Sequence, residues 1–138
     1  MRITLESDYA MRIISELAKA DGILDANTLS ERTMVTQRFA LKILHKLVGA
    51  DIVTSFKGVN GGYKLKKNAD KITLKEIIEL IDGPIAISRC IGNGQSCALN
   101  GDKTACEFHH IFDKISFELA TKLQKISIKD VLDKDYVI

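Results

Sequence analysis

The sequence predicts a mainly α-helical fold with one small β-hairpin and a long C-terminal helix. Three observations carry this prediction. Apolar residues recur at helical spacing in several segments, two short β-prone runs flank the glycine-rich sequence KGVNGG, and one apolar stripe continues from residue 111 to residue 126. The chain has 138 residues, of which 46% are hydrophobic and 28% charged, which is enough for one soluble domain with its own core.

Three helices are predicted in the first fifty residues. The first begins at Ser7, a good N-cap, and the second covers residues 27–33 with Leu29 facing inward. The third runs from the capping residue Thr36 to about Val48. Only Met34–Val35 separates the second helix from the third, so the two form a helix-turn-helix. The stripe expected to be buried on the third helix comprises Phe39, Ala40, Ile43, Leu44 and Leu47.

The hairpin follows directly after the third helix. Its predicted strands are Ile52–Phe56 and Tyr63–Lys67, and the segment between them contains Gly58, Gly61 and Gly62. A helix-turn-helix followed by such a hairpin is a winged helix. We expect the glycines to let the backbone of the wing approach a phosphate group closely.

The second half of the chain holds two further predicted helices. One spans residues 72–85, with Thr73 and Glu76 as a capping box, and ends at Gly83–Pro84. A loop over residues 86–103 leads to a last helix over residues 104–125. We expect this last helix to pack both on a second copy of the chain and on the first helix of its own chain. Its apolar stripe comprises Ile111, Phe112, Ile115, Leu119, Leu123 and Ile126.

The charge distribution points to nucleic acid. The whole chain carries a net charge of +2, but residues 36–67 contain seven basic side chains and one acidic side chain. A local basic patch on a nearly neutral chain is typical of nucleic-acid binding, although a solvated basic face is the alternative reading. We expect the third helix to read the major groove with Thr36, Gln37, Arg38 and Lys42. We expect the wing to contact phosphate or the minor groove with Lys57, Asn60, Gly61 and Lys64.

Three cysteines, Cys90, Cys97 and Cys106, are spaced C-x6-C-x8-C. Thiolates are soft ligands, and three of them in a glycine- and asparagine-rich segment suit zinc or an iron–sulfur cluster, whereas ordinary free thiols are the alternative. Zinc fingers use C-x2–4-C pairs, which are absent here, so the spacing favours the larger iron–sulfur centre. A fourth ligand is required. The candidates are His109, three residues after Cys106, and Asp8 of a second copy, which we prefer.

The order of these motifs resembles the Rrf-two family of bacterial transcription regulators. The resemblance covers nearly the whole chain, and SFKGVNGGYKL and ITLKEIIELIDGPI are its specific parts. It implies a dimer that binds a palindromic operator and a 2Fe–2S or 4Fe–4S cluster whose state switches DNA affinity. It places Cys90, Cys97 and Cys106 at the cluster-ligand positions, Asp8 at the carboxylate ligand of the nitric-oxide-sensing branch, and His109 at the histidine of the cluster-assembly branch. This sequence departs from the family pattern at Leu41, where many members carry a glutamate, and at Lys57, where an arginine is common.

The sequence therefore predicts a homodimeric, cluster-controlled regulator of double-stranded DNA. Its expected parts are a winged helix-turn-helix DNA-binding domain at residues 1–85, a cysteine-bearing cluster loop at 86–103, and a dimerisation helix with a C-terminal segment at 104–138. The first rival uses zinc or a reversible thiol switch, and the second is an iron–sulfur carrier or electron-transfer protein without DNA binding. No catalytic triad, P-loop or dinucleotide fingerprint is present, so no enzyme is predicted. The chain has no signal-peptide pattern and no apolar run of about 18 residues, so we expect a cytoplasmic protein without a membrane contact.

Overall fold

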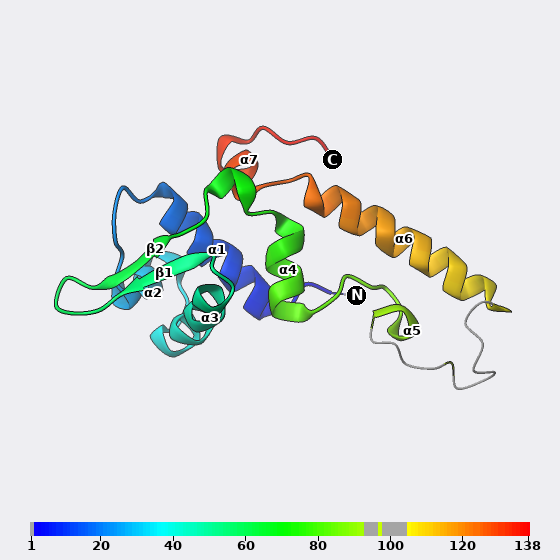
Figure 1. Cartoon of the computed structure of the whole chain (residues 1–138), viewed down its shortest axis with the longest axis horizontal. Helices are drawn as coiled ribbons and strands as arrows, with labels where there is room; N and C mark the ends of the chain where they lie inside the picture. Colours follow the sequence, from blue (N-terminus) through cyan, green and yellow to red (C-terminus); the bar gives the residue numbers. More distant parts are fainter. Residues whose placement is uncertain (1, 93–96, 98–104) are drawn as a thin grey trace.

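The computed structural model describes the chain except residues 1, 93–96 and 98–104. It is mainly helical with one two-stranded antiparallel sheet, as predicted (Figure 1). The helices α1, α2 and α3 pack together with the hairpin on one side of the molecule, and α6 extends away on the side opposite the hairpin.

The first helix, α1 (Leu5–Lys19), begins earlier than predicted. Its N-cap is Thr4, whose hydroxyl accepts a hydrogen bond from the Ser7 backbone, and Ser7 itself is buried. Thr4 is held in turn by Asp82, whose carboxylate accepts bonds from the Thr4 backbone nitrogen at 3.1 Å and from its hydroxyl at 2.5 Å. The expected cap at Ser7 was wrong because a carboxylate 78 residues away fixes the start of the helix.

The helix-turn-helix is present as α2 (Ala26–Thr33) and α3 (Gln37–Gly49). Asp25 caps α2 and Thr36 caps α3, the latter as predicted. The turn between them is closed by Met34 in the left-handed conformation, with φ of 57°, and by Ser30, whose hydroxyl donates to the Val35 carbonyl at 2.6 Å. The buried side of α3 consists of Ala40, Ile43, Leu44 and Leu47.

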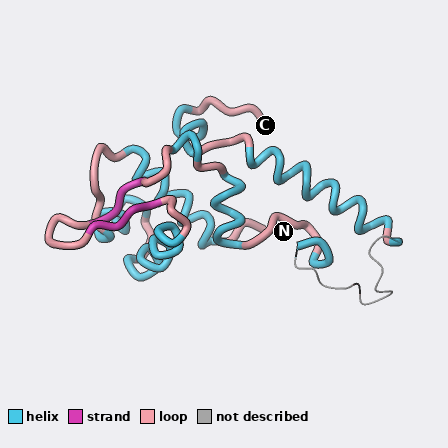
Figure 2. Tube along the Cα trace, in the orientation of Figure 1, coloured by secondary structure: helices cyan, strands magenta, loops and turns pink. Residues whose placement is uncertain are grey.

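The wing is formed by β1 (Val53–Phe56) and β2 (Gly62–Leu65), which pair antiparallel with Val53 opposite Leu65 and Phe56 opposite Gly62 (Figure 2). The hairpin is tied to the α1–α2 connection, because Leu24 and Tyr63 exchange two backbone hydrogen bonds of 3.0 and 2.8 Å. The start of β2, next to the tip of the wing, is therefore fixed to the segment before α2.

A fourth helix, α4 (Leu74–Asp82), follows a 3₁₀ turn, η1 (Ala69–Lys71). Thr73 caps α4 as predicted, accepting a hydrogen bond from the Glu76 backbone. The other half of the predicted capping box is missing, since the Glu76 carboxylate bonds the Lys67 ammonium at 2.6 and 2.8 Å instead. A full charge is a stronger partner for a carboxylate than a backbone amide.

The C-terminal half contains α5 (Arg89–Gly92), α6 (Glu107–Gln124) and α7 (Ile128–Asp133). Part of the predicted loop is thus the short helix α5, and Thr104, the predicted start of the last helix, lies outside the described residues. Within the chain, α6 packs mainly on α4 and α5, whereas α7 rather than α6 packs against α1. Ile128 of α7 is buried in the core beside Ile72.

Candidate functional site

The outward side of α3 carries two stripes of side chains that are exposed or, at Lys46, half-buried. One stripe comprises Phe39, Lys42 and Lys46, and the other comprises Arg38, Leu41 and His45. The first stripe is turned towards α1. The Phe39 ring meets the Tyr9 ring edge to face at 6.1 Å, so Phe39 is 47% exposed beside α1 rather than part of the core, and its predicted burial was wrong.

Glu6 of α1 binds two lysines of this stripe. Its carboxylate oxygens lie 2.7 Å from the Lys46 ammonium and 3.1 Å from the Lys42 ammonium. The hydrogen bond from Lys46, with support from Lys42, lowers the pKa of Glu6 below its ordinary value of 4.5. Both ion pairs are therefore present at neutral pH and are lost only as the pH falls through that lowered value. Lys42, predicted to contact bases, is thus engaged by Glu6 in the isolated chain.

Replacing Glu6 by glutamine tests whether this carboxylate competes with DNA. Glu6→Gln should strengthen binding to DNA of random sequence and steepen its salt dependence by about one to two units, because Lys42 and Lys46 become available to phosphate. Glu16→Gln is the matched control, since Glu16 lies on the same helix, is equally exposed at 21% and pairs with Lys19 instead. Fluorescence anisotropy over a salt series measures both quantities. Equal effects of the two variants would assign the change to net charge alone.

The tip of the wing presents Lys57 and Asn60 to solvent, with Lys64 exposed on β2. Gly61 is required there for a structural reason: a Cβ atom at this position would lie 2.3 Å from the Phe56 carbonyl oxygen. Gly62 has φ of 153°, and its Cβ would lie 2.5 Å from the Leu24 oxygen. The glycines thus allow the tip to fold on itself. Their predicted contact with phosphate stays a prediction.

Of the seven basic side chains between residues 36 and 67, four form ion pairs in the described structure. Besides the two lysines held by Glu6, Lys66 pairs with Asp51 at 2.8 Å and Lys67 with Glu76. In the described part of the chain, no carboxylate forms an ion pair with the remaining cations, which are Arg38, Lys57 and Lys64. Arg38 is on α3, and Lys57 and Lys64 are on the wing, so each of these elements carries a positive charge that no carboxylate of the described residues pairs with.

The second candidate site is the cysteine region. The Cys90 sulfur on α5 lies 3.4 Å from Nδ1 of His109 on α6, and 3.1 Å from the Ser88 hydroxyl. Cys106 is the N-cap residue of α6, three positions before His109. All three cysteine side chains are half-buried. Across the described residues, no group of three His, Cys, Asp or Glu side chains gathers tightly enough for one metal ion. The donors nevertheless suit an iron–sulfur centre, because a thiol and an imidazole converge and a second thiol starts the same helix.

Asp8, the other predicted ligand, is engaged within α1. Its carboxylate pairs with the Arg12 guanidinium at 2.6 Å, and both side chains are about half exposed. Arg12 also donates to the Thr33 carbonyl at the end of α2 at 3.4 Å and lies over the Tyr9 ring. Asp8 is therefore connected to the helix-turn-helix rather than to the thiols of its own chain.

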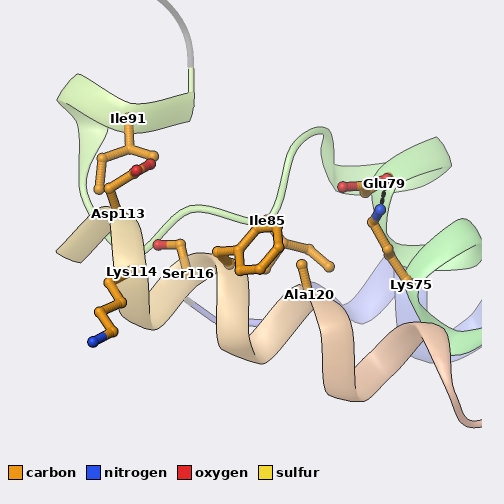
Figure 3. A pocket seen from close by; sticks show the side chains of 9 residues that line it. Lys75, Glu79, Ile85, Ile91, Asp113, Lys114, Ser116 and Ala120 are labelled. Atoms are coloured by element: carbon orange, nitrogen blue, oxygen red, sulfur yellow. Dashed lines mark ion pairs between the residues drawn. The ribbon is translucent and has the colours of Figure 1, made fainter. Parts of the chain in front are cut away.

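A groove of about 440 Å³ separates α6 from α4 and the segment leading to α5 (Figure 3). Ser116 lies on its α6 side, is buried, and accepts a hydrogen bond from the Ile87 backbone at 3.0 Å while donating to the Phe112 carbonyl. Ser116 thus fixes α6 to the segment that leads to Cys90. Ile111 and Ile115, which lie away from this groove on α6, are exposed.

A sequence model of the Rrf2 family, the Rrf-two family of the resemblance above, matches residues 3–134 and is described as an iron-dependent transcriptional regulator. The chain belongs to the Rrf2 family. It is therefore a DNA-binding transcription regulator, and regulators of this family are not enzymes. In the described part of this Rrf2 chain, every helix is too short or too polar to cross a lipid bilayer.

Relatives of this Rrf2 protein match it over most of their length. The rrf2-like HTH-type transcriptional regulator of Rhodobacter capsulatus is 28% identical over 137 residues, covering 94% of this chain and 91% of the relative. The HTH-type transcriptional regulator IscR of Cronobacter sakazakii is 28% identical over 140 residues, covering 100% and 84%. The solved structure of CymR, the global cysteine regulator of Bacillus subtilis, has a TM-score of 0.77 at 21% identity, covering 97% and 98%. This last match shows the fold alone, and it confirms the winged helix.

Two features of this Rrf2 site were missed by sequence reasoning. One is Glu6, whose lysine partners lie 36 and 40 residues away. The other is the division of α3 into two stripes, one of which faces α1. Helical spacing places Lys42 and Lys46 on the same side as Phe39, and an acidic residue in the first turn of α1 was the only available signal for their partner.

Proposed function

We propose that this regulator is a homodimer whose affinity for its operator is controlled by an iron–sulfur cluster. The approach of Cys90 to His109 carries the proposal, since it joins a soft and a borderline ligand from two helices. Cys90, Cys97 and Cys106 would supply the thiolates. We assign the fourth position to His109, because Asp8 would first have to leave Arg12. A bound cluster supplies iron whose ligation and redox state respond to oxidants and nitric oxide.

The chain itself connects the cysteine region to the DNA-reading helix. Ser116 holds the segment that joins α5 to α4, and Asp82 at the end of α4 holds Thr4 at the start of α1. Two residues after Thr4, Glu6 holds α3 through Lys42 and Lys46. A change in the position of α5 relative to α6 would therefore be transmitted to α3 through these hydrogen bonds and ion pairs. The cluster at one end and DNA at the other would then shift the same equilibrium between two arrangements of the helices.

The DNA contacts proposed for this regulator centre on the basic side chains that form no ion pair among the described residues. Arg38 and Gln37 on the first turn of α3, with the Thr36 cap, would contact base edges and phosphate in the major groove. Lys57, Asn60, Gly61 and Lys64 of the wing would contact the backbone or minor groove. Lys42 would join them after leaving Glu6. The three units proposed for these tasks are residues 1–85, 86–103 and 104–138.

The decisive experiment is purification without oxygen, followed by visible absorption spectroscopy and iron and sulfide counts. We expect brown protein that loses its colour in Cys90→Ala, Cys97→Ala and Cys106→Ala. His109→Ala should shift or weaken the spectrum, whereas Asp8→Ala should leave it unchanged. His110→Ala is the matched control, because His110 is exposed beside His109 on the same helix. A spectrum perturbed by Asp8→Ala alone would transfer the fourth position to the carboxylate.

The second candidate is a zinc site or a reversible thiol switch, which the presence of three cysteines between residues 90 and 106 favours. It predicts colourless protein even after anaerobic reconstitution. Bound zinc without sulfide would establish the metal form. Metal-free protein whose DNA affinity changes on oxidation and is restored by a reductant would establish the thiol form.

A further inference from the structure

The tip of the wing contains an asparagine followed by a glycine, Asn60 and Gly61. Asn60 is exposed, so water reaches its side-chain amide. Gly61 cannot be exchanged for another residue, because a Cβ atom there would lie 2.3 Å from the Phe56 carbonyl oxygen and 2.9 Å from the Gly58 carbonyl oxygen. The fold of the tip therefore requires a glycine directly after an exposed asparagine.

An asparagine followed by glycine can lose its side-chain amide without an enzyme. The backbone nitrogen of the next residue attacks the side-chain Cγ, and a glycine offers no side chain that hinders this approach. A bond forms between the Gly61 nitrogen and Asn60 Cγ, the Cγ–Nδ2 bond breaks, and ammonia leaves with the proton of the Gly61 nitrogen. Water then opens the succinimide ring. Opening at Cγ gives aspartate, and opening at the backbone carbonyl gives isoaspartate, whose main chain runs through the former side chain.

A backbone hydrogen bond restrains this reaction in the folded wing. The Gly61 nitrogen donates to the Gly58 carbonyl oxygen at 3.0 Å and closes the turn at the tip. The nitrogen can attack only after it has lost its proton, so this hydrogen bond has to open first. The turn is exposed at Gly58, Val59 and Asn60, and exposed turns open by local fluctuation without unfolding of the domain. The reaction should therefore proceed in the folded chain, but more slowly than in the unfolded chain.

We propose that Asn60 is a site of spontaneous deamidation, that opening of the wing turn sets its rate, and that the product weakens DNA binding through the wing. Lys57 and Lys64 flank the site in the sequence and form no ion pair among the described residues. An aspartate at position 60 places a carboxylate between these cations. An isoaspartate lengthens the main chain by one carbon in a turn whose backbone atoms already lie close together. The effect on DNA rests on the proposed function, whereas the chemical reaction does not.

The reaction is tested on the full chain, incubated at mildly alkaline pH with a reductant, once folded and once in urea. Peptide mapping by mass spectrometry quantifies aspartate and isoaspartate at each asparagine. Asn68 is the internal control, because it is also exposed but precedes Ala69, whose methyl group hinders the attack. We expect product at Asn60 well before Asn68, and faster in urea. An amide at Asn60 that persists as long as that of Asn68 would overturn the site, and equal rates with and without urea would overturn control by the turn.

The effect on DNA is tested by ageing the wild type and Asn60→Gln in parallel. Glutamine would have to close a larger ring, which forms far more slowly. The variant keeps the asparagine–glycine pairs at residues 93–94 and 100–101, so it controls for ageing elsewhere in the chain. Anisotropy over a salt series on random-sequence DNA compares each aged sample with its fresh counterpart. Aged wild type should bind more weakly, with a salt dependence flatter by about one unit for each modified wing, whereas aged and fresh Asn60→Gln should agree.

The outcomes separate this inference from the function on which its DNA effect rests. Equal losses on ageing in the wild type and in Asn60→Gln would overturn the effect at the wing and assign the loss to another position. Full conversion at Asn60 with unchanged DNA binding, in protein that thermal unfolding shows to be folded, would overturn the effect as well. Absence of salt-sensitive DNA binding in fresh protein would overturn the proposed function, while product at Asn60 would still establish the deamidation site.

Discussion

Ile115→Lys is expected to convert the proposed dimer into a monomer that keeps its fold. Ile115 is already 45% exposed in the single chain, so a lysine there costs the isolated protomer little. Within an interface along α6, the same lysine would be buried without a partner, which costs about 3–5 kcal/mol. The dimer dissociation constant should therefore rise at least about a hundredfold, and sedimentation velocity measures the change.

The control for this prediction lies on the same helix. Phe117 is 73% exposed, but it lines the groove on the side of α6 that faces α4. Phe117→Lys makes a larger apolar-to-charged change away from the proposed interface and should leave the dimer intact. A stable dimer of Ile115→Lys, together with a monomeric Phe117→Lys, would move the interface to the groove side.

Arg38→Ala should cause the largest loss of sequence-specific DNA binding among the α3 variants. Arg38 is exposed at the start of α3, where side chains of a recognition helix reach base edges, and its fork can form two hydrogen bonds to guanine. Its removal should cost about 1–3 kcal/mol on the preferred operator, a factor of roughly 5 to 150, and much less on scrambled DNA. Paired salt titrations on the two DNAs measure this difference.

Lys64→Ala provides the contrast, because Lys64 is a free cation on the wing. Its loss should weaken both DNAs equally and flatten the salt dependence by about one unit. If Arg38→Ala behaved in the same way, Arg38 would be a backbone contact, and the half-site would have to be read by other residues.

Local signals in the sequence were sufficient for most of the fold. Thr36 and Thr73 cap α3 and α4 as predicted, because a capping hydroxyl needs only the backbone three residues ahead. The hairpin was equally accessible, since its turn depends on glycines that lie within the turn itself. Where prediction failed, a distant partner was involved. Asp82 moved the start of α1, and Lys67 took the carboxylate of the expected capping box.

The same distinction between local signals and distant partners applies to the candidate sites. Residue type and position placed Arg38, Lys57 and Lys64 on exposed elements. The pairing of Glu6 with Lys42 and Lys46 depends on how α1 packs against α3, which an acidic residue in the first turn of α1 does not by itself determine. For the cysteines, spacing indicated ligand chemistry and left the geometry open. The approach of Cys90 to His109 depends on how α5 packs against α6, and the eighteen intervening residues carry no periodic pattern from which that packing follows.

The junction between α4 and α7 has a consequence for biosynthesis. Residues 72–74 and 126–128 exchange backbone hydrogen bonds, Leu74 to Ile126 and Ile128 to Ile72, each 2.9 Å long. Ile72 and Ile128 are both buried, so the core includes a strand-like pair separated by more than fifty residues. A nascent chain cannot complete this core until residue 128 has left the ribosome. A chain that ends before residue 126 would therefore lack both backbone hydrogen bonds of this junction and the packing of α7 on α1, and its core would stay incomplete.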